Sequence, residues 1–260
     1  MNMDVSKKNK LIVFYSPQGG AGKSTLAVNT SIFSAMFGSK TLLVDMSIYG
    51  SVVSSLKIQQ SGNLGLTSVI TLLDLDKGTT ASSNLNEVIK NSIRENIPVD
   101  NLDVIISANP IKMEAMNENY TKKLMEAIRS LNYDNIIIDT SSELNEKNFT
   151  LLEMADYVVM PLIQDISCGW KTVLFKEISE RYIANSDKIG LIVNKCNKYS
   201  GFNNTEFESE IGYKVIGEIP LFLKKYQNYV NEGISINLIK NKKAYKSFSN
   251  AAKHILENVK

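Results

Sequence analysis

The feature that most constrains this chain is a glycine-rich segment between an apolar run and a helical pattern. Residues 11–16 read LIVFYS, residues 17–25 read PQGGAGKST, and the helical pattern then continues to position 37. A turn of this kind directs backbone N–H groups and the positive end of a helix toward one point, which suits a polyphosphate. The segment therefore predicts a strand, a phosphate-binding loop and a helix in succession.

The loop supplies candidate ligands for a nucleotide. Its glycines let the main chain approach phosphates closely, and Lys23 is expected to contact the β- and γ-phosphates. The hydroxyl of Ser24 is expected to bind Mg²⁺, and Thr25 to reach the α-phosphate. The candidate binding residues of the loop are Gly19, Gly20, Ala21, Gly22, Lys23, Ser24 and Thr25. The alternative is a tight turn that binds nothing.

The rest of the chain alternates between strand and helix patterns. Short apolar runs lie at residues 11–15, 41–44, 102–106, 135–138, 157–161, 188–193 and 214–219. Helical patterns lie at residues 24–37, 119–131, 145–154, 169–183 and 243–259. Continuous apolar strands that alternate with helices predict an α/β fold, a doubly wound, mostly parallel sheet with helices on both faces.

We expect one domain over residues 10–260, preceded by a flexible tail at residues 1–9. The polar stretch at residues 51–100 is rich in Ser, Asn and Thr, and we expect short helices there, over one edge of the sheet.

Composition excludes several classes of protein. The net charge of +2 is too small to indicate nucleic-acid binding by itself. Cys168 and Cys196 have neither a metal-binding spacing nor a disulfide framework, so reduced thiols are expected. No apolar run approaches the ~20 residues of a transmembrane segment, and the first ten residues lack the apolar core of a signal peptide. These features predict a cytoplasmic protein.

Three polar residues stand at the ends of apolar runs, where open α/β sheets bind their ligands. Asp139 follows three isoleucines, and for it a magnesium-binding role is favoured over that of a turn residue. For Asp45 and Asn194 the alternative of a simple turn residue is closer.

The loop and four later segments resemble, in order, the motifs of the ParA/MinD superfamily of P-loop ATPases with a deviant Walker A loop. The four segments are LLVDMS at 42–47, YDNIIIDTSS at 133–142, LIVNKCNK at 191–198 and VIGEIPLF at 215–222. The resemblance covers nearly the whole chain from Leu11, and it implies ATP and Mg²⁺ as cofactors.

The resemblance also implies roles for single residues. Asp139 corresponds to the Walker B acid and would hold Mg²⁺ together with Ser24. Asn194 corresponds to the residue that reads adenine, and Pro220 lies in the segment that closes the base pocket. The catalytic residues would be Lys23, Asp45 and Asp139.

Residues associated with hydrolysis in the family are replaced here. The first lysine of the deviant loop, which reaches the partner's nucleotide in a dimer, is Gln18, and a neutral amide cannot offset developing charge. The aspartate that orients the attacking water is Ser47, a much poorer base than a carboxylate. Ser141 and Ser142 stand where paired prolines are common. We therefore expect weak or absent hydrolysis, unless other residues substitute.

The expected function is a nucleotide-switched positioning protein that forms an ATP-dependent homodimer and binds a protein partner of unknown identity. The GSV of residues 50–52 resembles the CpaE/TadZ-like branch, which positions pilus or secretion machinery. One alternative is an active ParA-type DNA partition ATPase. Another is a non-enzymatic scaffold that holds nucleotide as part of its structure.

Lysines gather near the C-terminus, with Tyr245 and Phe248 between them. They could bind nonspecific DNA through its phosphates, whereas the alternative is a solvated helix face with the two aromatics in the core. The apolar set Ala251, Ile255 and Val259 is expected to dock on the sheet, not on lipid. The lysines named for DNA binding are Lys240, Lys242, Lys243 and Lys246.

Overall fold

The computed structural model describes residues 9–59, 64–75, 82–183, 186–199, 203–222 and 241–259. The expected tail, apart from Asn9, and Lys240 lie outside the described residues. The described strands form one seven-stranded sheet in the order β3-β2-β4-β1-β5-β6-β7, and every neighbouring pair is parallel. This confirms the predicted doubly wound α/β fold.

The strands agree with the predicted apolar runs to within a few residues at each end. They are β1 (Lys10–Phe14), β2 (Thr41–Met46), β3 (Leu102–Ile105), β4 (Asn135–Thr140), β5 (Tyr157–Ile163), β6 (Ile189–Cys196) and β7 (Lys214–Pro220). Alternate side chains of a strand point to opposite faces. In β1, Leu11 and Val13 accordingly join one apolar cluster while Ile12 joins the other, and all three are fully buried. Burial on both faces explains why the strand patterns are continuously apolar.

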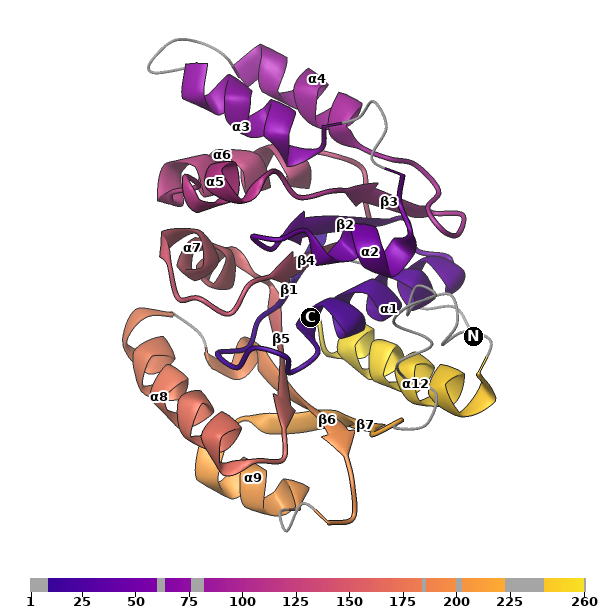
Figure 1. The fold of residues 1–260 in the computed structure, drawn as a ribbon, viewed down its shortest axis with the longest axis vertical. Helices are drawn as coiled ribbons and strands as arrows, with labels where there is room; N and C mark the ends of the chain where they lie inside the picture. The colour runs from indigo at the N-terminus through magenta and orange to yellow at the C-terminus, as the bar shows by residue number, and fades with distance from the viewer. Residues whose placement is uncertain are drawn as a thin grey trace.

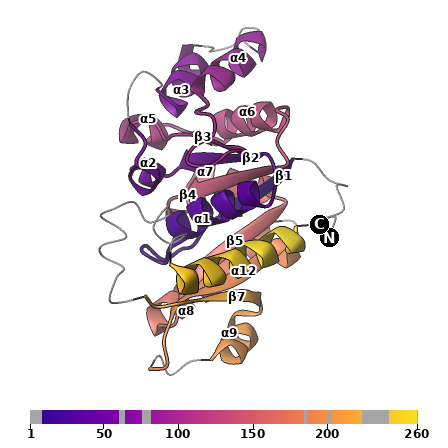
Figure 2. The same ribbon diagram turned by 90° about the vertical axis from the view of Figure 1, so that its right-hand side faces the viewer.

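The helices cover both faces of the sheet (Figures 1 and 2). One face carries α1 (Lys23–Met36), α2 (Ser51–Leu56) and α12 (Lys242–Asn258). The other carries α6 (Glu118–Arg129), α7 (Glu146–Met154), α8 (Ile166–Tyr182) and α9 (Asn204–Ile211). Beyond the β3 edge, α3 (Leu66–Leu75) and α4 (Ser82–Ser92) pack beside α6, and α5 (Pro110–Glu114) is short. The expectation of short helices within residues 51–100 is thus confirmed.

The last helix, α12, packs on α1 and β7. Its apolar residues Ala251 and Ile255 are buried, as is Phe248, and Tyr245 meets Phe33 edge-on with ring centroids 5.0 Å apart. The helix is therefore docked on the protein, as the sequence predicted. Among the described residues no helix is both long enough and apolar enough to cross a membrane.

The sequence patterns did not predict the two short helices α5 and α9, although each begins with a capping signal. The helix α5 starts at an Asn-Pro pair, in which the Asn109 side chain accepts the Lys112 N–H. The helix α9 starts with a capping box between Asn203 and Glu206. Neither helix has the apolar periodicity on which the predictions relied, because both are short and polar.

Candidate phosphate-binding site

The loop between β1 and α1 is open at the helix N-terminus. Helix α1 begins at Lys23 with Gly22 as its N-cap, and no described side chain caps it. The first amides of a helix have no intrahelical acceptor, and they carry the positive end of the helix dipole. A cavity of about 430 Å³ lies directly over this end, and Gly20, Ser24 and Thr25 are among its lining residues. The arrangement suits a bound anion.

Two glycines of the loop have backbone conformations that other residues rarely adopt. The φ angle is +74° at Gly20 and +103° at Gly22. A Cβ atom at Gly22 would also lie 2.1 Å from the Asn194 amide nitrogen. At Gly19 the φ angle is not positive, and a Cβ atom there would meet nothing within 4 Å among the described residues. The requirement for glycine is therefore strongest at Gly22.

Lys23 lies in the wall of the cavity. Its ammonium donates to the Ser142 hydroxyl at 2.5 Å, which ties the loop to the segment after β4. Burial lowers the pKa of Lys23, while the carboxylates of Asp139 and Glu143 oppose that shift. An ammonium donates strong, charge-assisted hydrogen bonds to phosphate oxygens, so Lys23 fits the predicted phosphate contact.

Asp139 sits at the end of β4 and is fully buried. Neither carboxylate oxygen has a well-formed hydrogen bond among the described residues. Burial raises the pKa of this carboxyl, as does the charge of Asp45, whereas the nearby Ser24 hydroxyl and Lys23 lower it. An unpaired buried carboxylate is unfavourable unless a cation compensates it. Asp139 and Ser24 therefore fit the oxygen ligands that Mg²⁺ prefers.

Asp45 is also fully buried, but its oxygens are occupied. One accepts the Ser47 N–H at 3.0 Å and the Ser47 hydroxyl at 2.5 Å, and the other accepts the Val52 N–H at 2.9 Å. Burial raises the pKa of Asp45, and these bonds oppose the shift. Asp45 is thereby engaged in holding the turn between β2 and α2, and its predicted catalytic role remains a prediction. The Ser47 hydroxyl lines the cavity but is already donated to Asp45.

The adenine candidates lie around a second, narrow cavity next to the loop. It measures about 30 Å³, and Thr25, Asn194, Pro220 and Phe248 are among its lining residues. The Asn194 side chain donates to the Ala21 carbonyl at 2.7 Å and accepts the Lys195 N–H at 2.9 Å. The structure thus brings Asn194 and Pro220 together beside the loop, and the Asn194 amide is hydrogen-bonded to the loop at Ala21.

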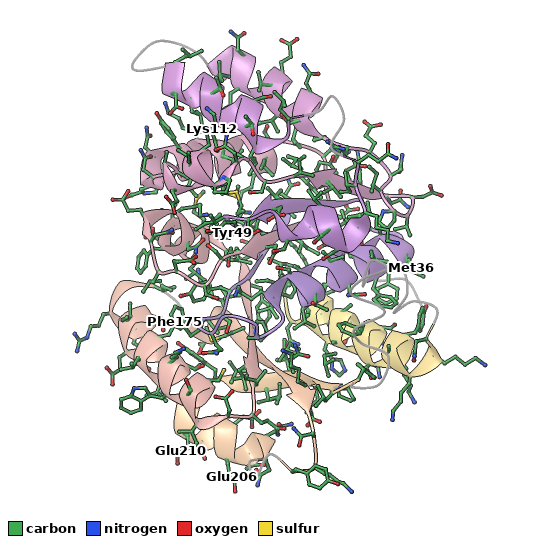
Figure 3. All side chains as sticks on the ribbon, in the orientation of Figure 1. Met36, Tyr49, Lys112, Phe175, Glu206 and Glu210 are labelled. Carbon is green, nitrogen blue, oxygen red and sulfur yellow. The ribbon has the colours of Figure 1, made fainter. Side chains whose placement is uncertain are left out.

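Four residues that the sequence analysis did not single out also shape the site. Lys195 donates to the Gly20 carbonyl at 2.8 Å, and exposed Glu143 lines the large cavity. Tyr49, labelled in Figure 3, is 87% exposed and lines the same cavity from the segment after β2. Lys147 is fully buried and donates to the Met46 carbonyl at 2.7 Å. Only Lys195 had a sequence signal, because it directly follows Asn194.

Burial also acts on Lys147, and it lowers the pKa of this lysine to about 8 against the opposing charges of Glu143 and Asp45. The lysine sits in the first turn of α7, so it joins that helix to the end of β2.

The side chain of Gln18, in the loop before α1, accepts a hydrogen bond from Lys171 of α8 at 2.7 Å. Gln18, which replaces the first lysine of the family's loop, is thus contacted by the ammonium of Lys171.

The C-terminal lysines within the described residues lie on the outer face of α12. Lys242, Lys243 and Lys246 are exposed, while Ala244 and Phe248 of the same helix are buried. Their placement fits both a solvated helix face and an accessible basic patch.

The comparisons with known proteins agree with the fold. The AAA_31 family model, described as an AAA domain, matches residues 9–180, which is more than half of the chain. The chromosome-partitioning ATPase Soj of Treponema pallidum (strain Nichols) is 30% identical over 155 residues, 59% of this chain. The match spans 56% of Soj, little more than half of that relative's length.

Two solved structures share the fold over almost their entire length. A ParA family ATPase from Chlorobium tepidum TLS superposes with a TM-score of 0.77 at 20% identity, covering 95% of this chain and 99% of that one. The septum site-determining protein MinD of Pyrococcus horikoshii OT3, complexed with Mg-ADP, gives 0.73 at 16% identity, with coverages of 95% and 96%. The similarity to Soj and the fold shared with the ParA and MinD structures support the predicted relation to the ParA/MinD superfamily, and the chain belongs to the AAA_31 family of AAA domains.

Proposed function

We propose that this chain binds ATP with Mg²⁺ and works as a nucleotide-dependent switch with weak hydrolysis. The observation that carries the proposal is the open N-terminus of α1 beside an unpaired, fully buried Asp139. The helix end would hold the phosphates, and Lys23 would contact the β- and γ-phosphates. Asp139 and Ser24 would hold Mg²⁺, which would neutralise charge on the phosphates. The structural relative from Pyrococcus was solved with Mg-ADP, which supports this choice of ligand.

Two replaced residues support the expectation of slow hydrolysis. Gln18 carries no charge, and the hydrogen of the Ser47 hydroxyl is directed to Asp45, away from a substrate water. We expect turnover well below the ~10 s⁻¹ of a median enzyme. The double substitution Gln18→Lys with Ser47→Asp should raise it severalfold if these residues are the cause. A variant that turns over no faster than the unmodified chain would contradict this explanation.

The switch would act through assembly, with ATP favouring a dimer. The segments that would form the dimer contacts are the one after Asp45 and residues 141–145, because both border the cavity through Tyr49 and Ser141. Light scattering with ATP, with ADP and without nucleotide tests this, at several protein concentrations. We expect a larger mass with ATP alone. Equal masses in all three states, with nucleotide bound, would favour the scaffold alternative.

The cargo we propose is pilus or secretion machinery, on the resemblance of residues 50–52 to CpaE/TadZ-like proteins. Residues 51–52 open α2, and Tyr49 beside them is exposed next to the cavity, so a nucleotide could alter this surface. Affinity capture with ATP and with ADP tests the idea. Recovery of pilus or secretion components with ATP is expected, and recovery of a centromere-binding partner would contradict it.

DNA partition is the second candidate function. It is favoured by the name of the Treponema relative, a chromosome-partitioning ATPase, and by the three exposed lysines of α12. Strong stimulation of ATP turnover by DNA would favour this candidate over a slow switch.

A further inference from the structure

The replaced motif residue leaves the site without its usual carboxylate for the attacking water. Ser47 lines the cavity but is bonded to Asp45, and Asp139 is fully buried where it would serve the metal. Among the described residues that line the cavity, Glu143 is the one carboxylate. Resting on the proposed binding of ATP, we propose that Glu143 is a catalytic residue that holds the attacking water and accepts its proton.

The loop that carries Glu143 is fixed from several sides. The Asn148 side chain donates to the Glu143 carbonyl at 2.7 Å and to the Ser141 hydroxyl at 3.2 Å. The Tyr15 hydroxyl donates to the Ser142 carbonyl at 3.3 Å, next to the bond between Lys23 and Ser142. A catalytic group must be held by such supporting contacts to act on a bound substrate.

The charges around Glu143 keep it ionised. Burial alone would raise the pKa of Glu143, but the Ser141 hydroxyl, the Glu143 N–H, and the ammonium groups of Lys147 and Lys23 outweigh it and lower the pKa. The cations come from two elements, Lys23 from α1 and Lys147 from α7. An ionised carboxylate can accept a hydrogen bond from water, which a serine hydroxyl engaged elsewhere does poorly.

The step itself is the hydrolysis of the terminal phosphate. The water oxygen forms a bond to the γ-phosphorus, and the bond from that phosphorus to the β–γ bridging oxygen breaks. The bond's electron pair leaves with ADP, and the proton released by the water passes to the Glu143 carboxylate before it reaches solvent or phosphate. Lys23 stays beside the phosphates and offsets the charge that moves onto the leaving group.

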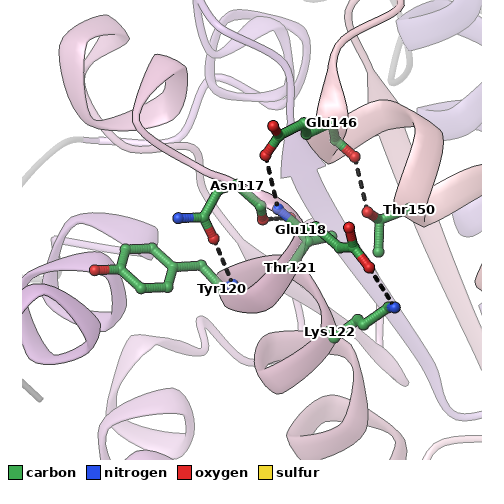
Figure 4. Close-up of polar contacts among 7 residues, drawn as sticks. All are labelled: Asn117, Glu118, Tyr120, Thr121, Lys122, Glu146 and Thr150. Atoms are coloured by element: carbon green, nitrogen blue, oxygen red, sulfur yellow. Dashed lines mark hydrogen bonds and ion pairs between the residues drawn. The ribbon is translucent and has the colours of Figure 1, made fainter. Parts of the chain in front are cut away.

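The test compares Glu143→Gln with the unmodified chain under single-turnover conditions, with protein in excess over ATP and Mg²⁺. Acid–base groups contribute about 10²–10⁴-fold, so we expect hydrolysis to fall about 100-fold or more while ATP affinity stays within about threefold. The matched control is Glu146→Gln, three residues further on. The Glu146 carboxylate accepts the Glu118 N–H at 3.4 Å, between α6 and α7 and outside the cavity lining (Figure 4). The control should hydrolyse ATP at the unmodified rate.

The outcomes separate this role from the proposed function. If the unmodified chain binds no ATP, the proposed function itself fails. If ATP binds and Glu143→Gln hydrolyses it at the unmodified rate, the role of Glu143 is overturned. The role is also overturned if the unmodified chain binds ATP but hydrolyses none, or if Glu143→Gln loses affinity and keeps its rate. A second variant, Ser47→Asp with Glu143→Gln, should regain part of the lost rate by returning a carboxylate to the cavity.

Discussion

Replacing Gly22 by alanine should weaken ATP binding without removing any side chain that contacts the nucleotide. A residue other than glycine at a φ of +103° costs about 1–2 kcal/mol. The new Cβ atom would also displace the Asn194 amide, which lies 2.1 Å away and donates to the Ala21 carbonyl. Losing that hydrogen bond costs about 1 kcal/mol. If the loop needs this shape to bind phosphates, the total of about 2–3 kcal/mol corresponds to about 30- to 150-fold in affinity.

Titration calorimetry of ATP with Mg²⁺ measures this change, and Gly38→Ala is the matched control. Gly38 has a φ of +95°, but a Cβ atom there meets nothing within 4 Å among the described residues, and the residue follows the far end of α1. The control has the same kind of backbone strain without a collision, so thermal unfolding should shift slightly and ATP affinity should not change. A Gly22→Ala variant that binds ATP within threefold of the unmodified chain would refute the argument that Asn194 and this glycine set the loop's shape.

Two further perturbations test the surroundings of the site. Lys147→Met removes the donor to the buried Met46 carbonyl, so urea unfolding should show a loss of about 2 kcal/mol. Because the folded pKa of Lys147 lies at about 8, below its unfolded value, this residue makes stability rise with pH above 8, and the variant should lack that rise. Fluorescence anisotropy against salt tests the basic patch. Duplex DNA, if bound, should show a slope of about −3 that vanishes on triple replacement by Glu of Lys242, Lys243 and Lys246.

The fold could be predicted in large part because parallel strands that are buried on both faces appear in the sequence as continuous apolar runs. The run before Asp139 and the run that contains Val13 each became a central strand of the sheet. The order of the strands did not follow from periodicity, because the pairing of β1 with β4 and β5 depends on contacts between residues far apart in the sequence. The sequence therefore predicted a parallel sheet but not the order of its strands.

The place of the candidate site could be predicted from the local motif at Gly22–Ser24, but the contacts that its residues make across the sheet could not. The bond from Lys23 to Ser142 joins residues that lie 119 positions apart in the chain. From the sequence alone, Glu143 looks like an ordinary surface acid, whereas in the structure it lines the cavity after β4. The bond from Asn194 to the Ala21 carbonyl is likewise long-range, and spacing along the chain cannot reveal contacts of this kind.

The most direct test of the account is the affinity of ATP with Mg²⁺ for the unmodified chain and for Lys23→Ala, by titration calorimetry. Lys23 alone brings an ammonium from α1 into the cavity wall, where it meets Ser142. We predict saturable binding by the unmodified chain and at least a tenfold loss in the variant, about 1.4 kcal/mol. Unchanged affinity in Lys23→Ala, or no binding by the unmodified chain, would contradict the claim that this loop is a nucleotide site.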